Sequence, residues 1–204
     1  MLEYDHYSPH RLSLSGAPSA VVSTADLKAF LRVDTSDDDD LIAAIGAAAT
    51  AHLDGRNGVL GRALGTQTWV WSLDRFPGHV TGNIYADLRV PLPPLQSVTS
   101  ISYVDPDGDS QTLSTDVYDV DTKSVPGVIF LKYGQSWPSI REQRNAVTVT
   151  FVAGYSTVPG PLVQAIKNLS ALLYDQRSPV VTGTIATELP LGLRALIAPY
   201  MIHA

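Results

Sequence analysis

Residues 147–177 place a strand pattern directly before a helix pattern, and this succession constrains the fold more than any other stretch of the chain. The apolar residues Val147, Val149 and Phe151 alternate with polar residues. This period of two is typical of a strand that is buried on one face. A strand that leads into an amphipathic helix builds a core, so the rest of the chain has to supply the surfaces on which both elements pack.

The helix of this pair is expected over residues 161–175. Its apolar side chains recur three or four positions apart and form one stripe, made of Leu162, Ile166, Leu169 and Leu173. Pro161 suits the first turn of a helix, because a backbone N–H at that position has no partner within the helix.

Length and composition predict a protein that folds alone. The 204 residues, of which 45% are hydrophobic, fit one domain or a domain with extensions. The chain has no cysteine, which excludes disulfides and thiolate metal sites. Its longest apolar run, residues 41–51, is too short to cross a bilayer, and no charged segment followed by an apolar one opens the chain. We therefore expect a soluble, cytosolic protein without membrane contact.

The charge distribution argues against a nucleic-acid-binding surface. The net charge is −6, and the basic residues are scattered along the chain. A protein that binds nucleic acid without sequence preference needs a basic patch to neutralise phosphates. Ten of the 14 basic residues are arginines, which pair with carboxylates in a planar, bidentate manner and are enriched at protein interfaces. This composition favours a component of an assembly.

The N-terminal part predicts an arm followed by a short helix. Residues 1–21 have no hydrophobic period, and we expect an extended arm that is disordered or lies on a neighbouring molecule. A helix is expected over residues 24–32, with Ser23 or Thr24 as its cap.

A second helix is expected over residues 38–53. The aspartates of residues 37–40 lie where the helix dipole favours negative charge, so one should cap the helix while the others stay solvated. The predicted inner face comprises Leu41, Ile45, Ala48, His52 and Leu53. Gly46 and the alanines of this helix leave little bulk, which predicts a helical neighbour at close approach.

Residues 66–154 have β composition. Extended segments are expected at residues 68–73, 87–92, 98–104, 111–113, 117–120, 128–131 and 147–155. Turn residues at 105–109 and at 126–127 predict two hairpins. The middle of the chain is therefore predicted to be an antiparallel, hairpin-rich region, and the fold class to be α+β.

The C-terminal part predicts a docking element. Residues 178–188 have no period and are rich in threonine and glycine, which is typical of a mobile linker. Residues 189–200 have room for about two helical turns between prolines. An apolar element beyond a flexible linker suits attachment to a partner surface.

No motif supports catalysis or a bound cofactor. Asp105, Asp107 and Asp109 share the spacing that opens a calcium loop, but the glycine is misplaced and no closing glutamate follows, so we interpret them as turn residues. The five histidines form none of the spacings of metalloproteases, and no nucleophile-elbow motif occurs. We name no catalytic, cofactor-binding or metal-binding residue.

The aromatic residues of the β region allow two interpretations. The candidates are Trp69, Trp71, Tyr85, Tyr103 and Trp137. They resemble stacking platforms for bases, but no basic residues accompany them. We interpret them as core or interface aromatics.

The order of features along the chain resembles the tailed-phage head–tail connector, or adaptor, family of HK97 type and phiE125 type, whose members also occur in prophages and gene transfer agents. The resemblance covers about residues 22–200. It depends on motifs at residues 26–34, 37–45, 66–69, 73–77, 91–98, 101–105, 137–138, 149–155 and 161–175. These motifs are structural turns and core positions.

The resemblance implies a structural protein of the virion neck that is assembled in the bacterial cytoplasm. Members of the family form a ring, expected to be twelve-fold, between the portal protein and a stopper or other tail-side connector. DNA passes through the channel without sequence-specific binding. The fold implied is a small helical bundle with an inserted β region, here a connector domain over residues 22–177, followed by a linker and docking segment over residues 178–204.

The resemblance also implies which residues contact the portal. They are the apolar and basic residues of the C-terminal segment, namely Leu189, Leu191, Leu193, Arg194, Leu196, Ile197 and Tyr200.

The residues alone allow two other hypotheses. A β-rich module with exposed aromatics suits binding to a carbohydrate or another surface. A hydrolase with paired aspartates is the third hypothesis, and nothing in the spacing of the aspartates supports it.

Overall fold

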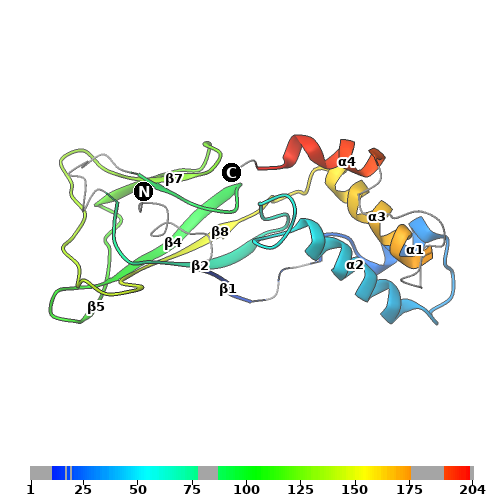
Figure 1. The fold of residues 1–204 in the computed structure, drawn as a ribbon, viewed down its shortest axis with the longest axis horizontal. Helices are drawn as coiled ribbons and strands as arrows, with labels where there is room; N and C mark the ends of the chain where they lie inside the picture. The colour runs from blue at the N-terminus through cyan, green and yellow to red at the C-terminus, as the bar shows by residue number, and fades with distance from the viewer. Residues whose placement is uncertain (1–10, 17, 19, 78–86, 176–190, 203–204) are drawn as a thin grey trace. The chain divides into compact units, whose positions relative to one another are not determined.

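The computed structural model describes residues 11–16, 18, 20–77, 87–175 and 191–202. The described residues form four α-helices and two antiparallel sheets, which confirms the predicted α+β class (Figure 1). The chain divides into two units, each with its own core. The β unit comprises Met1–Pro18 and Thr66–Gly154, and the helical unit comprises Ser19–Gly65 and Tyr155–Ala204.

The larger sheet of the β unit has five strands in the order β1-β2-β8-β4-β5. Their bounds are β1 Leu12–Leu14, β2 Gln67–Leu73, β4 Leu95–Val104, β5 Ser110–Thr112 and β8 Val147–Ala153. The strand β8 lies between β2 and β4 and pairs with both over its whole length. The strand expected at residues 147–155 is thus the centre of this sheet, and it ends at Ala153.

The smaller sheet has the order β3-β7-β6, with β3 at Leu88–Arg89, β6 at Tyr118–Asp121 and β7 at Val128–Leu131. Both predicted hairpins are confirmed, since β4 pairs with β5 and β6 pairs with β7. The two sheets contact each other at Gly127, where a Cβ atom would lie 2.5 Å from Cβ of Leu95. Residue 127 therefore has to be small.

The core of the β unit is built by alternation along β2 and β8. Every second residue of these strands is buried, including Trp71 and Phe151 at 1% and 0% exposure. Leu88 and Ile129 of the smaller sheet are buried as well. Burial of large apolar side chains on one face of each strand is the main stabilising contribution to such a unit.

The predicted N-terminal arm needs one correction. Leu12–Leu14 is not a free arm, because it forms β1 and pairs antiparallel with β2 of the same chain. Leu12 is buried, and Arg11 pairs with the carboxylate of Asp74. A three-residue edge strand is too short to produce a recognisable hydrophobic period, which is why the sequence did not indicate it. Residues 1–10 lie outside the described part of the chain.

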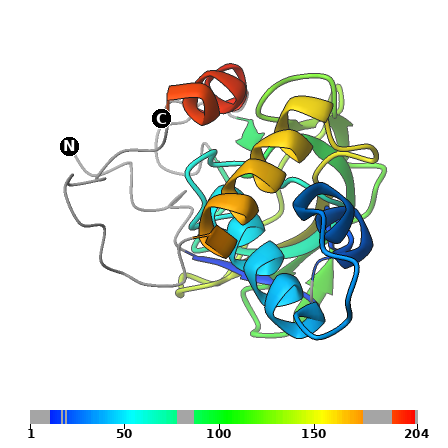
Figure 2. The ribbon, with the colours of Figure 1, turned by 90° about the vertical axis from the view of Figure 1, so that its right-hand side faces the viewer.

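The helical unit contains α1 at Thr24–Leu31, α2 at Asp39–Leu53, α3 at Gly160–Asp175 and α4 at Leu191–Ile197, which continues into the 3₁₀-helix η2 at Ala198–Tyr200. Figure 2 shows these helices within their unit. The linker expected at residues 178–188 falls outside the described residues.

The start of α1 follows its predicted capping chemistry. Ser23 is the N-cap, and its hydroxyl accepts a hydrogen bond from the backbone N–H of Asp26 at 3.0 Å. The same hydroxyl donates to the Asp26 carboxylate at 2.6 Å. This bond lowers the pKa of Asp26, because it stabilises the charged form of the carboxylate.

The aspartates before α2 differ in part from the prediction. Asp38 occupies the N-cap position, but its side chain makes no capping bond and instead accepts from the hydroxyl of Tyr174 at 2.5 Å. Asp39 pairs with Lys28 at 2.5 Å. Asp37 and Asp40 are exposed, as expected for solvated carboxylates.

The predicted inner face of α2 was right at Leu53 and wrong by about one position elsewhere. The buried residues are Ile42, Gly46, Ala49 and Leu53, whereas Leu41 and His52 are exposed. The reason is Gly46, where a Cβ atom would lie 2.4 Å from Cδ1 of Leu27. Because the glycine admits the Leu27 side chain of α1, the contact forms over a small residue rather than over the larger side chains.

The stripe of α3 is buried at its first three predicted positions, Leu162, Ile166 and Leu169. Leu173 is 40% exposed, so the core ends one turn before the helix does. Ala165 and Ser170 are buried in addition.

Candidate interaction site

The C-terminal segment, which we define as residues 191–202, packs into the core of the helical unit. Leu193 and Ile197 lie four positions apart on α4 and are 4% and 1% exposed. They belong to the same apolar cluster as residues of α1, α2 and α3. The apolar side of α4 is therefore occupied by the chain's own core.

A backbone contact holds the end of the segment. The N–H of Ile202 donates to the carbonyl of Leu60 at 3.0 Å. The next residue, Gly61, has a φ of +65°, and a Cβ atom there would lie 3.5 Å from Cβ of Ile202. Glycine adopts this left-handed backbone without steric cost, so the loop can run close beside the C-terminal segment.

Arg62 forms the polar part of the same contact. Its side chain is only 8% exposed and donates from Nη1 to the hydroxyl of Tyr155. Its guanidinium carbon lies 5.8 Å from the ring centroid of Tyr155 and 6.0 Å from that of Tyr200. Both distances suit cation–π attraction.

Not every hydrogen-bonding atom of the buried Arg62 side chain has a partner within the described residues. Its Nε atom is buried and has no hydrogen-bond partner in this part of the chain. A buried donor without a partner costs free energy. The hydrogen bond to Tyr155 and the two aromatic rings are the favourable contacts of the buried guanidinium. Arg62 thus ties Tyr200, and with it the C-terminal segment, to the loop after α2.

Five of the seven predicted docking residues have a described burial, and they fall into three groups. Leu193 and Ile197 face inward, Leu196 and Tyr200 are half-buried, and Arg194 is exposed. Leu191 begins α4, and Leu189 lies outside the described residues. The outward side of the segment consists of Gly192, Arg194, Ala195, Ala198 and Pro199.

The sequence did not indicate the contacts of Leu60, Gly61 and Arg62 with the C-terminal segment. Roughly 140 positions separate them from Tyr200, and the only local signal was a glycine beside an arginine. A contact between such distant parts of a chain leaves no periodic pattern in either part.

The aromatic residues of the β region form core contacts. Trp69 and Trp71 are 6% and 1% exposed. Trp137 stacks on Phe76 with 4.7 Å between the ring centroids, and Tyr103 meets the edge of Phe76 at 6.1 Å. Trp69 and Trp71 are thus confirmed as core aromatics, whereas Tyr103 and Trp137 are half-buried. Tyr85 lies outside the described residues.

The candidate calcium loop is a hydrogen-bonded turn. Oδ1 of Asp105 accepts from the N–H groups of Gly108 and Asp109 at 3.0 and 2.9 Å, and Oδ2 accepts from Gln111 at 2.9 Å. These bonds, that from Gln111 first, lower the pKa of Asp105. Within the described ranges, no group of three or more potential metal-ligating side chains occurs.

The β unit contains an open cavity of about 320 Å³. It is lined by Asp74, Arg75, Ile140, Glu142, Gln143 and Arg144. Asp74 is engaged by Arg11 and by the N–H of Asn145 at 2.8 Å. The lining mixes both signs of charge.

No helix of the described residues is both long enough and apolar enough to cross a bilayer.

Leu53 rather than His52 faces the core at the end of α2, so the expectation that His52 borders the core was wrong.

Solved structures with a similar fold include chains of gene transfer agent (GTA) particles. A chain in the neck of an empty GTA particle computed with C6 symmetry has a TM-score of 0.73 and 22% identity, with 95% of this chain and 96% of that chain covered. A chain in the virion of a native GTA particle has a TM-score of 0.72 and 21% identity, with coverage of 95% and 96%.

A chain in the neck of a native GTA particle computed with C12 symmetry has a TM-score of 0.65 and 20% identity, again with 95% and 96% covered. No protein-family model and no curated protein matches the sequence. At these identities, the likeness establishes a shared fold over nearly the whole of each chain.

Proposed function

We propose that this chain is a structural neck protein of a phage-like particle, a head–tail adaptor that acts by binding rather than by catalysis. The observation that carries the proposal is the shared fold with chains of GTA necks over 95% of this chain. Both units of the chain take part in that likeness. The order of sequence motifs supports the same family independently.

The adaptor forms a closed ring between the portal protein and the next tail-side component, such as a stopper. The C6 and C12 symmetries of the necks that contain the similar chains support a ring of identical subunits, and we propose twelve copies. The net charge of −6 suits a channel through which DNA slides without adhering. The ring is assembled in the bacterial cytoplasm and ends in the neck of the particle.

The C-terminal segment contacts the portal through its outward side. Leu193 and Ile197 are buried in the chain's own core, so the docked segment presents Arg194 and its exposed neighbours while its inner side stays in place. The predicted portal-contact residues therefore have two roles. The inner residues hold α4 in place, and the outer residues contact the portal.

A null mutant of the gene tests the proposal in the producing strain. Loss of the adaptor should give DNA-filled heads without tails, and the wild-type gene supplied in trans should restore complete particles. Complete, infectious or transfer-competent particles from the null strain would refute the proposed function.

A further inference from the structure

The open cavity of the β unit, which we call the arginine pocket, is formed by two loops that the fold holds in place. Asp74 and Arg75 belong to the loop after β2, and the other lining residues, within 140–144, belong to the loop before β8. The N–H of Asn145 donates to the Asp74 carboxylate at 2.8 Å. The N–H of Arg141 donates to a carbonyl of β4 at 3.0 Å. Hydrogen bonds therefore fix the second loop at both ends.

An aromatic contact joins the same two segments. Phe76 directly follows Arg75 in the sequence and stacks on Trp137, with 4.7 Å between the ring centroids and 7° between the ring planes. Trp137 lies three positions before Ile140, which lines the arginine pocket. A pocket whose walls are already in place loses less conformational entropy when a ligand enters it.

Arginine predominates among the charged residues of the pocket. Arg75 and Arg144 line it, and Arg144 is exposed. The lining also includes Glu142 and Asp74, but the Asp74 carboxylate is already paired with Arg11. With that pair set aside, the lining contains two guanidinium groups and one carboxylate, in a chain whose net charge is −6. Since a guanidinium presents a planar fork of N–H donors, the pocket suits a carboxylate ligand.

The shape and charge of the pocket favour a protein ligand over nucleic acid. A protein that holds a DNA backbone neutralises several phosphates, with basic residues spread along a groove or stripe. Here the arginines line a single concavity of about 320 Å³, and they share it with Glu142. An acidic protein segment therefore fits the pocket better than a phosphate backbone.

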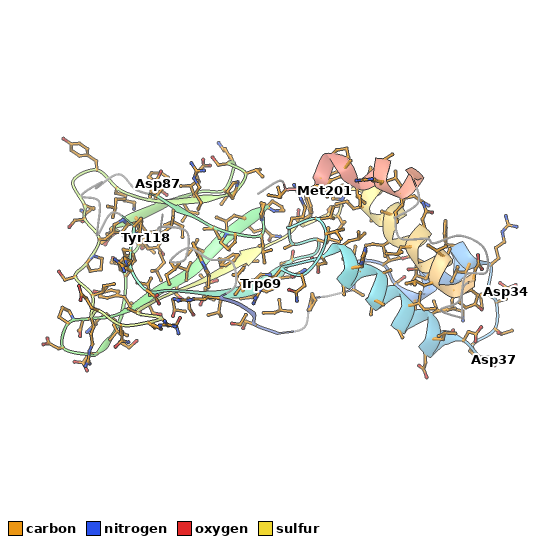
Figure 3. All side chains as sticks on the ribbon, viewed as in Figure 1. Asp34, Asp37, Trp69, Asp87, Tyr118 and Met201 are labelled. Atoms are coloured by element: carbon orange, nitrogen blue, oxygen red, sulfur yellow. The ribbon has the colours of Figure 1, made fainter. Side chains whose placement is uncertain are left out.

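The chain itself carries such a segment. Residues 34–40, which we call the acidic loop, lead from α1 into α2 and include five aspartates. Two of the five are engaged within the chain, by a tyrosine of α3 and a lysine of α1. The other three, Asp34, Asp37 and Asp40, are exposed, and Asp34 and Asp37 lie in the loop before α2 (Figure 3). The acidic loop belongs to the helical unit, whereas the arginine pocket belongs to the β unit.

We propose that the arginine pocket of one copy of this chain binds the acidic loop of a second copy, with Arg144 paired to one of the exposed aspartates. Charge complementarity between two features of the same chain identifies the occupant. The two features lie in different units, so the contact is head-to-tail, as in a closed ring of identical copies. The inference rests on the proposed function for the presence of neighbouring copies, whereas the two surfaces follow from their charges.

Cross-linking tests the contact without altering its charges. Gln143 lines the arginine pocket and Ser36 lies in the acidic loop, and both are exposed. The natural chain contains no cysteine. The full-length variant with Gln143→Cys and Ser36→Cys is assembled into particles and treated with a short bismaleimide, because an Arg–Asp pair holds the two backbones farther apart than a disulfide tolerates. The control variant joins Gln143→Cys with Gln164→Cys, an exposed position of α3 in the same unit as the acidic loop.

In assembled necks, the variant with Ser36→Cys should give covalently joined copies, and the control variant should stay monomeric. Intact necks without joined copies would overturn the assignment and leave the proposed function intact. A bridge within one chain would also overturn it. If DNA filled the pocket instead, the single variant Gln143→Cys would react with a maleimide more slowly in DNA-filled particles than in empty ones. That difference would likewise contradict a protein occupant.

Charge reversal supplies a second readout. Arg144→Glu should leave the unfolding temperature of the free protein nearly unchanged, because the side chain is exposed. It should lower the yield of complete particles about tenfold, since like charges then meet at the contact. The double variant with Asp37→Arg and Arg144→Glu should restore most of that yield. Arg89→Glu, at an exposed position of β3, is the control and should assemble normally.

Normal assembly of Arg144→Glu would contradict the assignment, and so would a double variant as defective as Arg144→Glu alone. If the wild-type chain were absent from particle necks, the proposed function would fail, and the assignment with it.

Discussion

The guanidinium carbon of Arg62 lies 6.0 Å from the ring centroid of Tyr200 and joins the C-terminal segment to the loop that follows α2. The hydrogen bond from Ile202 to Leu60 lies next to it. Two kinds of contact, one from side chains and one from the backbone, therefore hold the segment that we propose as the portal contact. Anchoring of this kind lowers the entropy that a docking segment loses on binding.

Replacement of Tyr200 should loosen the segment. Tyr200→Ala removes one of the two rings beside Arg62, and we expect the free energy of unfolding to fall by about 1–2 kcal/mol. Tyr200→Phe is the control, because it keeps the ring face and should stay close to wild type. Chemical denaturation of the free protein measures both, and an unchanged midpoint for Tyr200→Ala would show that the ring contributes nothing.

Enlarging Gly46 should separate α1 from α2. A Cβ atom at this position would lie 2.4 Å from Cδ1 of Leu27, so Gly46→Leu overpacks the helical core and should cost about 1–3 kcal/mol of stability. Ala43→Leu adds a leucine to an exposed position of the same helix and should change stability by less than about 0.5 kcal/mol. Equal stability of the two variants would contradict the close approach of the helices.

Acid should open the turn at Asp105. The pKa of this carboxyl is lowered in the folded protein, chiefly by the hydrogen bond from Gln111. Its stabilising effect is therefore fully present above the ordinary aspartate pKa of about 3.9, and it is lost as the pH falls through the lower, folded-state value.

The amide hydrogens of Gly108 and Asp109 report this change, because both donate to Asp105. Their NMR shifts should titrate below pH 4 in the wild type and should not titrate in this way in Asp105→Asn. Shifts that follow the same acid titration in both proteins would show that another group controls the turn.

A charge reversal on the outer side of α4 should weaken portal binding. Arg194 is exposed on the helix whose inner residues are buried, so Arg194→Glu should leave the unfolding temperature nearly unchanged. We expect about tenfold weaker binding, which corresponds to the loss of one favourable interface charge. Gln164→Glu, at an exposed position of α3, is the control. Unchanged portal binding by Arg194→Glu would show that the portal contact does not include Arg194.

Removal of the whole segment is a less informative experiment. The truncation deletes Leu193 and Ile197 from the core, and burial of each such side chain stabilises a fold by about 1.5–3 kcal/mol. A truncated chain would therefore lose stability as well as the docking surface. Point changes on the outer side separate the two effects.

The sequence predicted those parts of the fold that depend on local patterns. The alternation in β8, the turn chemistry at Asp105 and the capping by Ser23 each follow from neighbouring residues, and all three occur in the structure. The pairing of β8 with β2 and β4 was not predicted, because a strand pattern does not identify its partners. The edge strand β1 was not predicted, because its three residues are too few to show a hydrophobic period.

The close helical neighbour that Gly46 predicts is confirmed, because Leu27 of α1 packs against this glycine. The prediction of an inner face through Leu41 and Ile45 was wrong, since side-chain size alone does not show that the buried stripe runs through a glycine. The pairing of Arg62 with Tyr200 was likewise invisible, because only the fold brings residues so far apart in the chain together.

The most direct test of the central claim is a cryo-electron microscopy reconstruction of the neck of the particle that this chain helps to build. The account predicts a ring of twelve copies between the portal and the tail-side component, with α4 turned toward the portal. Density for this chain at any other place in the particle, or a neck complete without it, would contradict the account.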